Sequence, residues 1–162
     1  MSEFQIGEKA VYPGHGVAEV TGLEKRKISD SSMEFYVLRV LENSMKVMVP
    51  KHNADKVGLR RLVGEEEIQK VYEVLHRRDE KISTATWNRR YRAYSEKLRS
   101  GSVEELAQVT RDLYRLQADK ELSFGERQML EQARSLLIKE LSLATKREES
   151  EIAQEIEAVF AT

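Results

Sequence analysis

One short segment combines the residue types that bind nucleic acid: Thr86-Trp87-Asn88-Arg89-Arg90-Tyr91-Arg92. It places the only tryptophan of the chain beside three arginines. Arginine side chains neutralise phosphates, and a large flat ring can enter a groove or separate stacked bases. The segment therefore indicates contact with a polyanion.

The same tryptophan also fits a structural role. On a helix, a spacing of four, three and four residues would align one stripe of large side chains: Trp87, Tyr91, Tyr94 and Leu98. Aromatic stripes at helical spacing usually face a core. Spacing alone leaves both interpretations of Trp87 open.

Charge is distributed unevenly along the chain. The whole sequence carries a net charge of −1, but residues 76–99 contain eight Lys/Arg against three Asp/Glu, a net charge of +5. Residues 100–162 contain eight against thirteen, a net charge of −5. A basic segment on an acidic chain indicates an anionic partner, although a solvated helix face would carry the same pattern.

Composition limits the class of protein. With 162 residues and 40% hydrophobic content, the chain can bury one or two cores, and it contains no cysteine for disulfides or thiolate metal sites. The N-terminus lacks the basic and apolar segments of a signal peptide, and no apolar run reaches the roughly 18 residues of a membrane span. We expect a cytoplasmic protein without a membrane partner.

Motifs for catalysis are absent from the sequence. It contains no phosphate-binding glycine loop, no dinucleotide fingerprint and no Gly-x-Ser-x-Gly turn. The three histidines, His15, His52 and His76, are widely separated and lack metal-ligand spacing. We expect no enzyme activity, cofactor, metal site or small-molecule substrate.

The pattern of elements changes near residue 60 and predicts an α+β protein with domains at 1–60 and 61–162. The first part alternates short apolar runs with turn residues, as in a small Tudor-like or SH3-like β-barrel. The turns are expected at 12–16, 30–32 and 43–44. The expected strands are 10–12, 16–27, 35–41 and 45–50, with a possible fifth at 57–59.

The second part contains no proline and has helical periodicity, which predicts a compact all-α domain of about five helices. Residues 79–86 read as a polar connection, and Thr86 can cap the helix that contains Trp87. Capping boxes begin at Ser102 and Ser123, each followed by Glu three residues later. The other helices are expected to begin near Gly64 and Glu149.

The strand at 45–50 has an unusual outward face. Alternation places Met48 and Pro50 opposite the valines that would fill a core. Proline cannot donate to a strand ladder, so this strand should lie at an edge, where a partner strand can add. Alternatively, Met48 packs beneath the helical domain.

Five segments together resemble the bacterial CarD/CdnL family. The resemblance covers essentially the whole chain in the same order, and its Trp-x-Arg-Arg-Tyr segment is specific. The first domain also resembles the polymerase-interacting domain of the transcription-repair coupling factor, whose ATPase motor is missing here. The matching segments are Tyr12–Val17, Met48–Pro50, Val57–Arg60, Thr86–Tyr91 and Leu122–Leu130.

The resemblance implies a transcription regulator that bridges two partners. The Tudor-like domain would bind the RNA polymerase β subunit, and the helical domain would contact promoter DNA at the upstream edge of the bubble, without strong sequence preference. A tryptophan wedged into the minor groove would stabilise the open complex at housekeeping promoters, including those for ribosomal RNA. The protein would then be associated with the nucleoid through polymerase.

The resemblance also implies roles for individual residues. Trp87 matches the wedge, Arg89, Arg90 and Arg92 match phosphate-contacting positions, and Arg127 matches a further basic position at a helix N-terminus. Arg26 matches a polymerase contact, and Met48 stands where some relatives carry arginine. Phe35, Val37 and Pro50 belong to the same strand pair.

Two other functions fit the basic segment. A protein-interaction adaptor would use it to bind an acidic protein partner. A free RNA-binding protein would bind tightly without polymerase. A wedge that acts only on DNA already held open by polymerase predicts instead weak, salt-sensitive DNA binding by the free protein.

Overall fold

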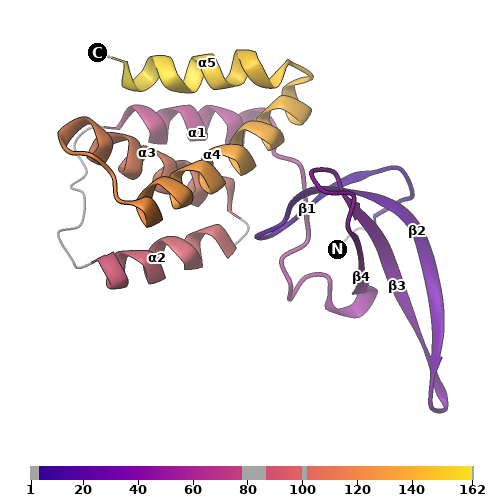
Figure 1. Cartoon of the computed structure of the whole chain (residues 1–162). Helices are drawn as coiled ribbons and strands as arrows, with labels where there is room; N and C mark the ends of the chain where they lie inside the picture. Colours follow the sequence, from indigo (N-terminus) through magenta and orange to yellow (C-terminus); the bar gives the residue numbers. More distant parts are fainter. Residues whose placement is uncertain (1–3, 78–86, 100–101, 162) are drawn as a thin grey trace. The chain divides into compact units, whose positions relative to one another are not determined.

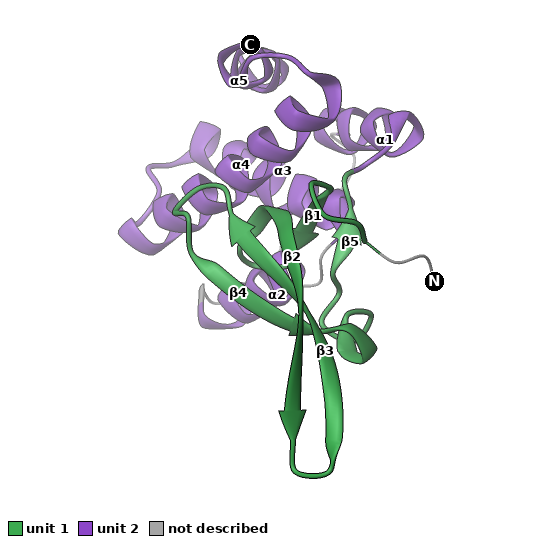
Figure 2. Cartoon of the chain, turned by 90° about the vertical axis from the view of Figure 1, so that its right-hand side faces the viewer, with its two compact units in different colours: residues 1–62 green, residues 63–162 purple. Residues whose placement is uncertain are grey.

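The computed structural model describes residues 4–77, 87–99 and 102–161, without the side chain of Trp87. The connection expected at 79–86 and the Thr86 cap lie outside the described residues. The chain forms two compact units, which comprise residues 1–62 and residues 63–162 (Figure 2). A β-rich unit followed by five helices confirms the predicted α+β class.

The first unit is a five-stranded antiparallel sheet in the order β4-β3-β2-β1-β5. In Figure 1, β2 and β3 form a long ribbon that extends beyond the other strands. A short 3-10 helix, η1, follows β4 at Lys51–Asn53. The strands are β1 (Lys9–Tyr12), β2 (Gly16–Ile28), β3 (Ser31–Val40), β4 (Lys46–Pro50) and β5 (Arg60–Arg61).

The core of the first unit packs on one face of this sheet. The residues on it alternate along each strand, because successive side chains in a strand point to opposite faces. Phe4 packs against the ring of Tyr36 edge to face, with 5.6 Å between ring centroids. The core also contains Ala10, Ala18, Val20, Leu38, Val40, Val49, Ala54 and Leu59.

Two local predictions for this unit are wrong. The fifth strand is Arg60–Arg61 rather than 57–59, because pairing with Ala10 and Val11 of β1, not local sequence, defines it. The β2–β3 turn is Ser29–Asp30 rather than 30–32, since Ile28 pairs with Ser31 and Ser29 has a φ of 56°. The turn at 12–16 is confirmed, with its two glycines at positive φ.

A β-bulge interrupts the β2–β3 ladder at Thr21. Val20 pairs with Leu38, but Gly22 pairs with Val37, so Thr21 is the extra residue. Because side chains alternate with a period of two, one extra residue exchanges the faces of every position that follows it. Beyond Thr21, the even-numbered residues of β2 therefore lie on the face opposite the core.

The described residues of the second unit form five helices, and their buried side chains make one apolar core. Figure 1 shows how these helices are arranged. Three acidic residues, Glu65, Glu66 and Glu67, occupy the first turn of the first helix. Ser102 caps the third, and Ser123 with Glu126 forms the predicted capping box of the fourth. The helices are α1 (Glu65–His76), α2 (Trp87–Arg99), α3 (Val103–Asp119), α4 (Phe124–Thr145) and α5 (Glu149–Phe160).

Buried polar side chains satisfy backbone groups where the helices meet. Glu140 of α4 accepts a hydrogen bond from the backbone N–H of Val63 at 3.1 Å. Arg111 of α3 donates to the carbonyl of Val74 at 3.3 Å, a carbonyl that also accepts from the backbone N–H of Arg77 at the end of α1. These bonds fix the ends of α1 against α3 and α4.

Candidate interaction surfaces

The outer face of the sheet, opposite the core, collects the residues expected to contact polymerase. Phe35 on β3 pairs directly with Pro50 on β4, and Val37 pairs with Met48. All four side chains are half-buried, whereas the inward Val49 is buried. Direct cross-strand neighbours have Cβ atoms about 5 Å apart, so the four form one apolar cluster.

Arg26 lies on this outer face because the bulge at Thr21 exchanges the faces of the β2 residues that follow it. It pairs with Met33, and the preceding even position, Glu24, pairs with Phe35. Arg26 Nε lies 3.2 Å from Glu24 Oε1, and both side chains are substantially exposed. The guanidinium is therefore held beside the apolar cluster but stays accessible to a partner.

Register adds two residues that the sequence did not single out. Met33 and Ile28 occupy the same face farther along the ribbon, and Ile28 is 50% exposed. The sequence did not reveal this part of the face, because the bulge at Thr21, which exchanges the faces, is not marked by a glycine at that position. The outer face therefore continues as an apolar stripe toward the Ser29–Asp30 turn.

The sheet also has an accessible edge. β4 is the terminal strand of the order, which confirms the position predicted from Pro50. An edge strand carries backbone groups that a partner strand can pair with. The outer face and this edge meet at Met48 and Pro50.

Helix α2 carries the basic segment on an exposed surface. Arg89 and Arg92 are exposed, and no carboxylate among the described residues forms an ion pair with either. Tyr94 and Leu98 belong to the helical core on another side of α2. Tyr91 is 50% exposed, so the predicted aromatic stripe is not buried along its whole length.

Trp87 is the first residue of α2. Its side chain lies outside the described part of the chain, so the wedge and core interpretations both remain hypotheses. Trp87 therefore lies at the N-terminal end of α2, and the first turn of this helix contains no acidic residue.

Arg90 differs from the neighbouring arginines. Its Nη2 lies 3.1 Å from Oε2 of Glu126, and the two side chains are only 11% and 3% exposed. Glu126 also accepts a 2.9 Å hydrogen bond from the backbone N–H of Ser123 and so completes the cap of α4. The pair ties α2 to the N-terminus of α4.

These contacts change the acidity of the groups involved. Burial opposes ionisation of Glu126, but the Ser123 backbone N–H and the Arg90 guanidinium outweigh it and hold its pKa below 4.5. Burial raises the pKa of Tyr94, Asp112 adds to the shift, and Arg90 opposes it. Arg90 therefore acts on both Tyr94 of α2 and Glu126 of α4.

Arg127 lies beside an open hollow at the beginning of α4. The hollow has a volume of about 640 Å³ and includes Phe124, which is 68% exposed, together with Gln128 and Glu131. No carboxylate pairs with Arg127 within the described ranges. The exposed Phe124 was not singled out from the sequence, although helical spacing places it with the polar residues Arg127, Gln128 and Glu131 rather than with the apolar face of α4.

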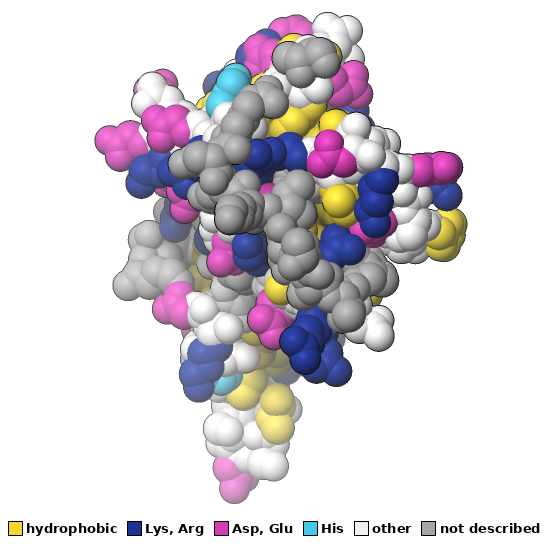
Figure 3. All heavy atoms as spheres, turned by 90° about the vertical axis from the view of Figure 1, so that its left-hand side faces the viewer, with side chains coloured by type: hydrophobic (Ala, Val, Ile, Leu, Met, Phe, Trp, Pro, Cys, Tyr) yellow, Lys and Arg dark blue, Asp and Glu magenta, His cyan; other side chains and the backbone are white. Residues whose placement is uncertain are grey.

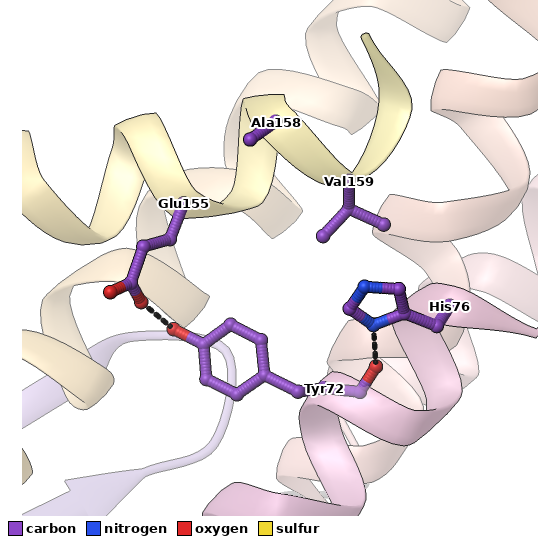
Figure 4. Close-up of a pocket in the computed structure, with 5 residues that line it drawn as sticks. All are labelled: Tyr72, His76, Glu155, Ala158 and Val159. Carbon is purple, nitrogen blue, oxygen red and sulfur yellow. Dashed lines mark hydrogen bonds between the residues drawn. The ribbon is translucent and has the colours of Figure 1, made fainter. Parts of the chain in front are cut away.

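A second hollow, of about 400 Å³, lies between α1 and α5 (Figure 4). Its polar groups bond to each other, since the Tyr72 hydroxyl donates to Glu155 at 2.8 Å and Glu155 also accepts from Arg147. Burial and this bond raise the pKa of Tyr72 to about 12. The hollow therefore serves the packing of α5 on α1 rather than offering a reactive group.

The described residues give no sign of a metal site, as they contain no cluster of three or more His, Cys, Asp or Glu side chains. None of the described helices is long and apolar enough to span a membrane. Figure 3 shows Lys and Arg side chains in several clusters, with Asp and Glu between them.

Comparison with known proteins places both units in one family. Residues 4–63 match the CarD-like/TRCF RID domain, and residues 70–157 match the CarD C-terminal domain. The second match alone covers more than half of the chain. The chain belongs to the CarD family.

The chain is also similar to individual proteins and solved structures. "Putative transcription factor YdeB" of Bacillus subtilis (strain 168) is 30% identical over 142 residues, covering 86% of this chain and 91% of the relative. CdnLNt from Myxococcus xanthus is 46% identical over 40% of this chain and 92% of that chain, with a TM-score of 0.34. The N-terminal domain of Myxococcus xanthus CarD is 27% identical over 36% and 79%, with a TM-score of 0.32.

Membership of this family defines the class of function. The chain is a transcription regulator that interacts with RNA polymerase, and CarD proteins are transcription factors rather than enzymes.

Proposed function

We propose that this protein binds the RNA polymerase β subunit through its first domain and stabilises the open promoter complex through its second. The domains are those expected at 1–60 and 61–162. The observation that carries the proposal is the clustering of Phe35, Val37, Met48 and Pro50 on one sheet face, with Arg26 beside them. An apolar cluster with an accessible cation at its rim fits a protein partner.

On the second domain, α2 and the beginning of α4 supply the DNA contacts. Arg89, Arg92 and Arg127 are exposed cations that no described carboxylate neutralises. Trp87 at the start of α2 enters the minor groove at the upstream edge of the bubble. Unstacking a base step costs a few kcal/mol, so the wedge acts only where polymerase already holds the DNA open.

Tethering explains why few cations suffice. Binding to polymerase raises the effective concentration of the helical domain at the promoter, and DNA affinity need not be high. Phosphate contacts carry no sequence information, so the protein acts at many promoters, with housekeeping and ribosomal RNA promoters as expected targets. This places the protein in the cytoplasm, at the nucleoid.

Open-complex lifetime tests the proposal. Purified polymerase would form complexes on a ribosomal RNA promoter, and their decay would be followed after a competitor is added, with and without the full-length protein. We expect a longer lifetime that is lost when residues 1–60 are deleted, together with loss of polymerase pull-down. An unchanged lifetime despite polymerase binding would favour the adaptor function with an acidic protein partner.

A further inference from the structure

We propose that Arg90 positions α2 by holding the carboxylate of Glu126, while Arg89 and Arg92 contact phosphate. This inference rests on the proposed DNA contact of α2 and divides Arg89, Arg90 and Arg92, the three arginines of that helix nearest Trp87, into two roles. Within a distance of four residues, identical side chains would then serve different purposes.

Burial separates the three arginines. The side chain of Arg90 is 11% exposed, whereas Arg89 and Arg92 are exposed residues. A phosphate group reaching Arg90 would have to displace Glu126, which is itself almost fully buried. Replacing one buried partner while the other stays in place leaves an uncompensated charge, so this exchange is unfavourable.

The carboxylate of Glu126 is held in place by α4 itself, independently of Arg90. Oε1 accepts from the backbone N–H of Ser123, while Oε2 faces the Arg90 guanidinium, so one carboxylate serves two helices. The backbone N–H of Glu126 donates to Ser123 Oγ at 3.2 Å and completes the cap. The position of the Glu126 carboxylate is therefore set by α4. The bond from Arg90 to this carboxylate holds α2 against α4.

The position of Arg90 on α2 suits this role. It lies near the beginning of the helix, three residues after Trp87, whereas the core contacts of Tyr94 and Leu98 come from the later turns. The later turns hold α2 in the core, and the Arg90–Glu126 pair restrains the turn that bears the proposed wedge.

Two readouts on the full-length protein test this division. The first is amide hydrogen exchange of α2 without DNA, and the second is the salt dependence of binding to a promoter DNA fragment. Each phosphate contact adds about 0.9 to the slope of log K against log salt concentration. The variants are R90Q, E126Q and the matched controls R89Q and R92Q.

We expect R90Q and E126Q to accelerate exchange in the first turns of α2 on the order of tenfold, the loss typical of a charge-assisted hydrogen bond. Both should weaken DNA binding without changing the salt slope, and the double variant should be no worse than either single one. Gln at position 126 retains the capping box, so α4 remains intact. R89Q and R92Q should each lower the slope by about one and leave exchange unchanged.

A lower salt slope in R90Q with unchanged α2 exchange would make Arg90 a phosphate contact and overturn the proposal. Unchanged exchange in E126Q would also overturn it, because the restraint requires that carboxylate. If the wild-type protein shows no salt-dependent DNA binding, the proposed function fails, and the exchange experiment still decides the positioning role alone.

Discussion

The outer sheet face and the exposed side of α2 are built in different ways. The sheet face takes its residues from β2, β3 and β4, and cross-strand pairs fix each neighbour. The α2 surface takes its cations from a few consecutive turns of one helix, and of Arg89, Arg90 and Arg92 only Arg90 forms an ion pair with a described carboxylate. One surface is mainly apolar, and the other is cationic and exposed.

The difference suggests how one surface that binds a protein and one that binds DNA can act together at a promoter. Apolar burial depends on shape and changes little with salt, so the sheet face suits a specific protein partner. Phosphate contacts depend strongly on salt and tolerate any sequence, so α2 suits DNA delivered by that partner. Specificity would then come from the first unit and the effect on the promoter from the second.

The largest effect should come from placing a charge within the apolar cluster. Val37→Asp should weaken binding to a β-subunit fragment on the order of a hundredfold, because the carboxylate would be desolvated without a partner. Ser32→Asp is the matched control, since Ser32 is an exposed residue of the same strand on the opposite face. Isothermal calorimetry would measure both, and equal affinities would mean that polymerase binds elsewhere.

Trp87→Ala should shorten the open-complex lifetime on the order of tenfold, since one aromatic stacking contact is lost. Affinity for polymerase should stay unchanged, because the sheet face is intact. The lifetime would be measured by competitor challenge, with circular dichroism to check folding. A folded variant with wild-type lifetime would contradict the wedge and favour a core tryptophan.

Smaller changes on the sheet face should separate its apolar and ionic parts. Met48→Ala should reduce affinity for the β-subunit fragment about fivefold through lost apolar contact. Arg26→Glu should reduce it by a similar factor that shrinks as salt is raised, because a rim charge is screened. If the affinities of both variants change equally with salt, the assignment of an apolar contribution to Met48 and an ionic contribution to Arg26 is wrong.

The last effect concerns folding rather than binding, namely the acid stability of the helical unit. Glu126 has a pKa below 4.5 in the folded state, so its stabilisation is present above that pH and is lost as pH falls through the folded pKa. Glu126→Gln should lower the free energy of unfolding at pH 7 by about 1–3 kcal/mol. The difference from wild type should narrow below pH 4.5 in urea titrations at several pH values, and a constant difference would contradict the assignment.

Much of the fold follows from local sequence. Glycines at a tight turn, prolines at strand ends and the Ser-x-x-Glu caps act through bonds within a few residues, so their positions mark the elements directly. The predicted edge position of β4 and the five helices are confirmed for the same reason. The short strand β5 was misplaced, because two residues become a strand only when a distant partner pairs with them.

By itself, the sequence determined the β-then-α order, the basic segment around Trp87 and the resemblance to a family of transcription regulators. Tertiary structure alone decided which side chains share a surface. A one-residue bulge at Thr21 brought Arg26 to the face of Phe35 and Val37, and a carboxylate 36 residues away set Arg90 apart from its neighbours. Register and long-range ion pairs depend on what the chain meets after it folds, and no local pattern encodes them.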